Sequence, residues 1–128
     1  MYSGITQSGW MFKRGAIVKS DKKRFFTLQG HTLFYFADDT VCKLVSLLSR
    51  RIDVVFQMKN PLGSIDLLEY VVENDQSQDK QGSICLRLCH PNKRNYWIWC
   101  ESSQAIKAWL KAMFPCVLAV NISAEFFF

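Results

Sequence analysis

The sequence predicts a mainly β domain in which several short strands are followed by one amphipathic helix. Runs of aromatic and β-branched residues, bounded by glycines or polar turns, fill most of the chain from residue 9 to residue 100. After residue 102 the apolar period changes from two to about 3.6 residues. Many short strands followed by one helix are typical of a β-barrel or sandwich whose open end the helix covers.

The first three strands are expected at 9–15, 24–30 and 31–37. Each run is rich in aromatic and other β-forming residues, and glycines stand at the ends of the first two. A polar, cationic loop at 16–23 separates the first strand from the second. These runs predict a meander without a helix before residue 38.

The later strands are expected where apolar and polar residues alternate or form a short extended run. A polar stretch at 73–82 predicts a loop between two of them, and a turn-rich segment at 90–95 precedes the last strand. These strands are predicted at 63–68, 70–72, 83–89 and 96–100.

One amphipathic helix follows the strands. Ser102 has the chemistry of an N-cap, and Pro115 is expected to end the helix. One helix face is predicted to be apolar through Ile106, Trp109, Leu110 and Met113.

The segment 41–59 has two interpretations. Its first half has apolar residues at helical spacing, namely Val41, Leu44, Val45 and Leu48. Its second half favours a strand through Ile52, Val54 and Phe56. The pattern does not decide between them.

The size and charge of the chain point to one domain with a local anion-binding surface. The 128 residues are 49% apolar, which suffices for a core without disulfides or a structural metal. The net charge of +5 is carried entirely by residues 1–28, and the remaining residues sum to zero. This distribution excludes a uniformly basic protein and predicts one cationic surface.

The cysteines and the apolar pattern predict a cytoplasmic protein. Five cysteines without a CxxC pair are typical of free thiols in a reducing compartment. Cationic and acidic residues interrupt the longest apolar stretch, so we expect no membrane-spanning helix, and no signal peptide is visible at the N-terminus.

The order of these elements resembles a pleckstrin homology (PH) domain. The resemblance covers residues 8–114 and rests on Gly9-Trp10, Lys13-Arg14-Gly15, residues 22–28, residues 33–36, residues 61–67, and Trp109. It implies a seven-stranded, bent antiparallel barrel capped by the C-terminal helix, with a long insertion at 41–59 between the third and fourth strands. The domain would span 9–115, after a lead at 1–8 and before an apolar tail at 116–128.

The resemblance also implies a phosphoinositide-binding module that recruits its protein to a membrane, as a cytoplasmic signalling adaptor. It implies that Lys13, Lys22, Arg24 and Tyr35 bind the head group at the open end of the barrel. Alternation independently places Lys22 and Arg24 on one strand face. The planar guanidinium of Arg24 suits two phosphate oxygens, the lysines act as point charges, and Tyr35 offers a hydroxyl donor.

A second group of cations is placed on the rim of this pocket. The insertion is cationic, and we hypothesise that it touches the membrane as an amphipathic element. The alternative for the insertion is that its apolar residues pack against the barrel. The cations of the 90–95 turn also have an alternative, which is that they are ordinary surface charges. The rim residues are Arg14, Lys19, Lys23, Arg50, Arg51, Lys93 and Arg94.

The alternative function is a protein-interaction domain of the same fold with little or no lipid binding, which would use the insertion or a sheet edge. Nucleic acid is not expected as a partner, because the cations lack interleaved exposed aromatics. No catalytic motif and no metal-ligand spacing occurs, so neither an enzyme nor a cofactor is predicted.

Members of the family selective for 3-phosphorylated lipids often carry arginine where this chain has Leu62, so no particular phosphoinositide is predicted.

Overall fold

The computed structural model describes residues 4–14, 20–47, 60–75 and 84–122. In these residues eight strands form one sheet in the order β4-β3-β2-β1-β7-β6-β5-β8. The strands are β1 (Ile5–Arg14), β2 (Asp21–Gln29), β3 (Thr32–Phe36), β4 (Gly63–Asp66), β5 (Val71–Asn74), β6 (Leu86–Cys89), β7 (Tyr96–Trp99) and β8 (Ala119–Asn121). The helices are α1 (Thr40–Leu47), α3 (Ser103–Met113) and the 3-10 helix η2 (Phe114–Cys116).

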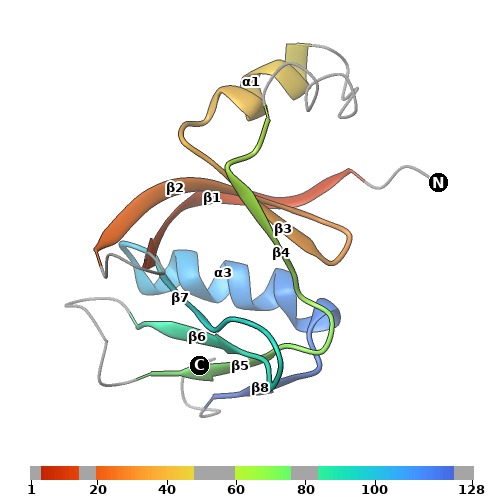
Figure 1. Cartoon of the computed structure of the whole chain (residues 1–128). Helices are drawn as coiled ribbons and strands as arrows, with labels where there is room; N and C mark the ends of the chain where they lie inside the picture. Colours follow the sequence, from red (N-terminus) through yellow and green to blue (C-terminus); the bar gives the residue numbers. More distant parts are fainter. Residues whose placement is uncertain (1–3, 15–19, 48–59, 76–83, 123–128) are drawn as a thin grey trace.

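β1 joins the two halves of the sheet. It pairs with β2 from Ile5 to Arg14, with an irregularity between Ile5 and Gln7, but it pairs with β7 only through Phe12 and Lys13. The half formed by β1–β4 therefore bends over the half formed by β5–β8, and α3 lies across the opening between them (Figure 1). This is the bent, helix-capped sheet that the sequence predicts, with β8 as one strand more than the predicted seven.

The core fills the space between the two halves and α3. As predicted, α3 buries Ile106, Trp109, Leu110 and Met113. The Trp109 ring meets the ring of Phe26 edge-on, with centroids 6.4 Å apart. This packing holds α3 against the concave face of the sheet.

Ser102 caps α3, as the sequence predicts. Its side-chain oxygen accepts a hydrogen bond from the backbone N–H of Ala105 at 3.2 Å, and its carbonyl oxygen accepts one from Ile106 at 3.3 Å. The extended backbone of Ser102 is the conformation expected for an N-cap.

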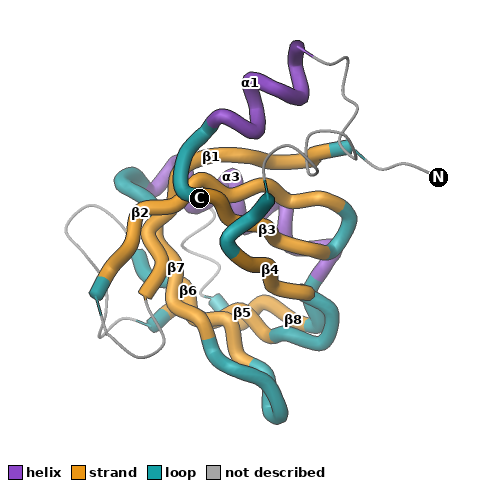
Figure 2. Tube along the Cα trace, turned by 45° about the horizontal axis from the view of Figure 1, so that its top comes forward, coloured by secondary structure: helices purple, strands orange, loops and turns teal. Residues whose placement is uncertain are grey.

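α1 shows that residues 41–47 of the ambiguous 41–59 segment form a helix. Val41 is fully buried against Phe25 and Phe36, on the face of the sheet that points away from the main core. Figure 1 and Figure 2 both show α1 standing off the β1–β4 half, on the side away from β5–β8. Leu47, at the end of α1, is 78% exposed. Residues 48–59, including the predicted strand at 52–56, lie outside the described residues.

β8 lies in the segment that the sequence assigns to the tail. It runs parallel to β5, with Val120 opposite Val72, and the Leu118 N–H donates to the carbonyl oxygen of Tyr70 at 2.8 Å. A run of only three residues, with exposed ends, carries too little alternation to be predicted as a strand. In the described residues no helix has the length and apolar character needed to cross a membrane.

Candidate functional site at the open end of the sheet

Strand register brings the predicted cations of β1 and β2 to one face. Lys13 is paired with Lys22, and Met11 with Arg24. Opposite residues of antiparallel strands point to the same side of the sheet. Because Met11 is fully buried in the core, this is the concave face. Lys13, Lys22 and Arg24 therefore project from the concave face at the end of the β1–β2 hairpin that carries its loop.

Lys13 lies at the centre of the site. It is only 8% exposed, and its Nζ is 4.8 Å from the ring centroid of Tyr35 and 5.7 Å from that of Tyr96. Burial lowers the pKa of Lys13, and the nearby guanidinium groups of Arg94 and Arg24 lower it further. The two rings offer cation–π stabilisation of about 0.5–2 kcal/mol each. The positive charges of Arg24 and Arg94 repel the Lys13 ammonium group and so oppose this stabilisation. With three cations close together, the site has an excess of positive charge.

Tyr35 contributes a hydroxyl that is held in place by the neighbouring strand. The residue stands opposite Phe26 on β2 and opposite Gly63 on β4. A Cβ atom at residue 63 would overlap the Tyr35 hydroxyl oxygen, so glycine is needed there for close approach. Burial raises the pKa of Tyr35, and the nearby Tyr96 raises it further. The hydroxyl is therefore protonated at neutral pH and available as a donor.

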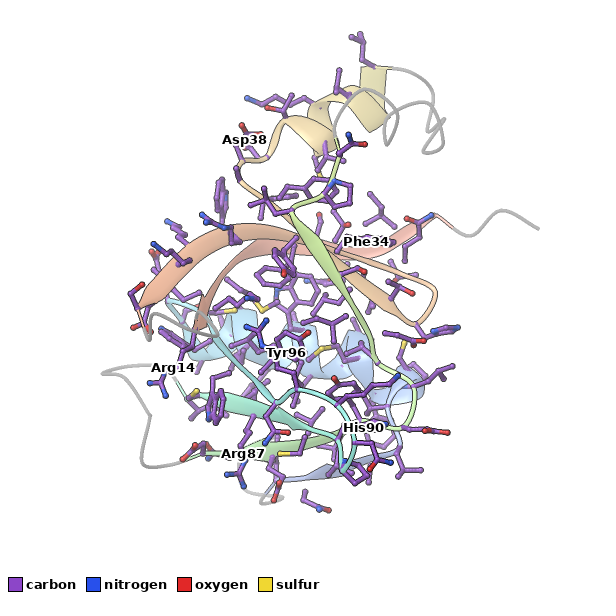
Figure 3. The ribbon with its side chains drawn as sticks, viewed as in Figure 1. Arg14, Phe34, Asp38, Arg87, His90 and Tyr96 are labelled. Carbon is purple, nitrogen blue, oxygen red and sulfur yellow. The ribbon has the colours of Figure 1, made fainter. Side chains whose placement is uncertain are left out.

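Arg94 and Tyr96 complete the site from the other half of the sheet. The Arg94 guanidinium carbon lies 4.6 Å from the centroid of the Tyr96 ring. Figure 3 shows Tyr96 in the opening between the two halves. We call Lys13, Lys22, Arg24, Tyr35, Arg94 and Tyr96 the mouth site.

Tyr96 was not predicted as a site residue, although alternation carries part of the signal. Ile98 is fully buried and stands opposite Lys13 across the β1–β7 pair. Tyr96, two residues earlier, therefore projects from the same face of β7. The pairing of β1 with β7 is the part that the sequence does not reveal.

Lys23 lies on the opposite face of β2. Its Nζ is 3.2 Å from Oε1 of Glu101, and it lies 5.5 Å from the Trp10 ring centroid and 5.8 Å from that of Phe12. Its two neighbours in the sequence, Lys22 and Arg24, belong to the mouth site, but Lys23 does not. Exposed ion pairs of this kind contribute little to stability.

The other predicted rim residues are dispersed. Arg14 lies over the Trp97 ring, with its guanidinium carbon 5.6 Å from the centroid, and Figure 3 shows it apart from Tyr96. Lys93 is exposed in the turn between β6 and β7. Lys19, Arg50 and Arg51 lie outside the described residues.

Together, the fold and the mouth site define a class of protein: an open, helix-capped β-barrel with a cationic, aromatic-lined mouth. The family model of the PH domain matches residues 5–117. The chain belongs to the PH domain family, as its resemblance predicts.

Two curated relatives match most of this chain but only part of their own length. The human pleckstrin homology domain-containing family A member 6 is 30% identical over 111 residues, which are 85% of this chain and 9% of the relative. Human Sesquipedalian-1 is 25% identical over 109 residues, which are 85% of this chain and 36% of the relative. The chain thus spans about a tenth to a third of the length of these curated relatives.

Solved structures share the fold. The human PH domain of pleckstrin homology domain-containing protein family A member 5 has a TM-score of 0.65 and 25% identity, covering 95% of this chain and 83% of that one. The C-terminal PH domain of pleckstrin, in a complex with D-myo-Ins(1,2,3,5,6)P5, has a TM-score of 0.64 and 19% identity, covering 91% of this chain and 98% of that one.

Proposed function

We propose that the mouth site binds the phosphorylated inositol head group of a membrane lipid. The observation that carries this proposal is the position of Lys13, which is nearly buried between two tyrosine rings and beside two arginines. A desolvated cation with cationic neighbours is costly until an anion arrives. A polyphosphorylated ring would supply that anion and several acceptor oxygens.

Each group of the mouth site has a role in this proposal. Arg24 and Arg94 offer planar forks that can each hold two phosphate oxygens. Lys13 and Lys22 supply point charges, and the Tyr35 hydroxyl donates to a phosphate or ring oxygen. Charge-assisted hydrogen bonds contribute roughly 1.5–3 kcal/mol each, so two or three of them with the surface attraction reach about the 8 kcal/mol of micromolar binding.

Ligands named for structural neighbours support the choice of ligand class. The C-terminal PH domain of pleckstrin has been solved with inositol pentaphosphates, and the Slm1 PH domain with inositol 4-phosphate. At 19% and 16% identity these proteins share the fold, and their ligands make inositol phosphates the first class to test here. We further propose that the domain acts as a non-enzymatic adaptor at the cytoplasmic surface of a membrane.

Vesicle binding tests this proposal. Phosphatidylcholine vesicles carrying one phosphoinositide species at a time are compared with phosphatidylserine vesicles of equal surface charge. Arg24→Ala should weaken binding to the preferred phosphoinositide by roughly tenfold or more, because it removes a charge-assisted pair. Lys23→Ala is the matched control: it removes the same charge from the neighbouring residue on the opposite face, and should change the affinity by less than about twofold.

Two outcomes would contradict the proposal. Equal binding to phosphatidylserine and phosphoinositide vesicles would reduce the mouth site to a nonspecific cationic surface. Absence of vesicle binding by a folded domain would favour the alternative, a protein-interaction domain of the same fold.

A further inference from the structure

The turn between β6 and β7 carries one residue of the mouth site. It runs from His90 to Asn95 and includes Arg94, whose guanidinium covers the Tyr96 ring. The hydroxyl of Tyr70 donates a hydrogen bond to the carbonyl oxygen of Arg94 at 2.9 Å. The contacts that hold this turn therefore hold Arg94 at the mouth.

His90 closes the turn through a hydrogen bond that requires a neutral ring. Its Nδ1 accepts from the backbone N–H of Asn92 at 3.0 Å, and its own backbone N–H donates to Oδ1 of Asn95 at 3.3 Å. A backbone N–H can only donate, so Nδ1 carries no proton and the ring proton is on Nε2. The side chain of His90 is only 5% exposed. In Figure 3 His90 lies at the end of the molecule where the β6–β7 turn is found.

The ionisable groups around His90 come from three elements. Oε2 of Glu69, in the turn before β5, lies 3.5 Å from Nε2, which makes no hydrogen bond within the described residues. The ring of Tyr70 lies 5.1 Å from the imidazole between centroids, and the ring of Tyr96 on β7 lies 6.3 Å from that of Tyr70. Within the turn itself, Lys93 and Arg94 are the cations.

A second proton on His90 would put two donors face to face. It must bind at Nδ1, where the new N–H would point at the N–H of Asn92 and the turn would lose its hydrogen bond. Histidine is the side chain whose charge changes between about pH 5 and pH 8.

We propose that His90 is a positioning residue for Arg94, and that its protonation opens the β6–β7 turn and weakens polyanion binding at the mouth site. This inference rests on the proposed function, because it adds a pH dependence to the binding of the polyanion by the mouth site. Its sign is opposite to that of simple electrostatics, since an added positive charge near the mouth would by itself tighten the binding of an anion as the pH falls.

The ligand test needs a probe whose own charge does not change with pH. Phosphate monoesters lose their second proton near pH 6, which would obscure the effect. Inositol hexakissulfate is a polyanion of fixed charge over this range and replaces inositol phosphates as the probe. Its affinity for the whole chain is measured by calorimetry between about pH 8 and pH 5.

We expect the affinity of the unmodified protein for inositol hexakissulfate to fall roughly fivefold as the pH is lowered from about 8 to about 5. A fivefold change corresponds to the free energy of about one hydrogen bond. His90→Gln should abolish this dependence. The chain has only two histidines, so His31→Gln is the matched control and should retain it. Tyr70→Phe should weaken binding even at about pH 8, because it removes a hydrogen bond that holds Arg94. An affinity that stays constant or rises on acidification, or a dependence that survives His90→Gln, overturns the proposal.

Proton NMR of the free protein separates this inference from the proposed function. The amide signals of Asn92 and Arg94 should shift with the imidazole signal of His90, and the amide shifts should be absent in His90→Gln. If they do not follow the imidazole signal, the switch is wrong whatever the ligand does. If they do and inositol hexakissulfate does not bind at any pH, the pH response of the turn stands and polyanion binding by the mouth site is wrong.

Discussion

The hydroxyl oxygen of Tyr35 occupies the space that the Cβ atom of a side chain at residue 63 would need, and Gly63 leaves that space open. The two residues are paired across β3 and β4. The adjoining Leu62 N–H donates to the Tyr35 carbonyl oxygen at 2.8 Å, which holds the two strands in this register. The absence of a side chain on one strand thus decides where the donor on the other strand points.

Gly63→Ala should displace the Tyr35 ring and weaken inositol phosphate binding by roughly as much as Tyr35→Phe, about five- to tenfold, because both remove one hydroxyl contact. Calorimetric titration with a soluble inositol polyphosphate measures this. The two changes should not add, since each removes the same contact. An additive effect in the double variant would show that Gly63 acts in another way.

Lys13→Met should stabilise the free domain while weakening head-group binding. Methionine retains most of the volume and removes a nearly buried charge with two cationic neighbours. We expect a gain on the order of 1 kcal/mol in the free energy of unfolding at neutral pH, measured with urea. A large loss of stability would contradict the interpretation that Lys13 destabilises the free domain and serves to bind the ligand.

Lys13 should contribute a component of the free energy of unfolding that rises with pH in the alkaline range. The difference between the unmodified protein and Lys13→Met isolates it from Cys100 and the buried tyrosines, whose raised pKa values act in the opposite direction. The folded pKa of Lys13 lies below the ordinary value of 10.5, so the unfolded chain binds more protons between the two pKa values. The destabilisation is fully present below the folded pKa and is relieved as the pH rises through it towards 10.5. Lys13→Met should remove this increment, which urea unfolding at a series of pH values will measure.

Substitutions at the two ends of α1 should separate packing from surface contact. Val41→Ala should lower the free energy of unfolding by about 1–3 kcal/mol, because Val41 is fully buried against Phe25 and Phe36. Leu47→Ser should change it by less than about 0.5 kcal/mol, since Leu47 is 78% exposed. If the insertion touches the membrane, Leu47→Ser should also weaken vesicle binding. Unchanged vesicle affinity would leave α1 as a packing element only.

Much of the fold could be predicted because its signals are local. The N-cap at Ser102 and the buried face of α3 follow from a few neighbouring residues, and both are confirmed. Alternation likewise places Lys22 and Arg24 on one strand face. The β8 strand was missed because three residues carry no period, and its partner β5 lies far away in the sequence.

The mouth site was less accessible to the sequence because it joins both halves of the sheet. Tyr96 and Arg94 reach Lys13 only through the pairing of β1 with β7, which a linear pattern does not specify. The turn chemistry of 90–95 was visible, but not the position of the Arg94 guanidinium over the Tyr96 ring. Lys23 shows the converse: its charge suggests a rim residue, while the one-residue alternation of β2 carries it to the other face.

The short strand β8 has a consequence for how the domain behaves when it is shortened. By pairing with β5 it covers a row of backbone donors and acceptors that would otherwise form an open sheet edge. The family match ends at residue 117, just before this strand. A chain cut there would expose β5 as a template for other chains, so it should self-associate and precipitate more readily than one that retains residues 118–122.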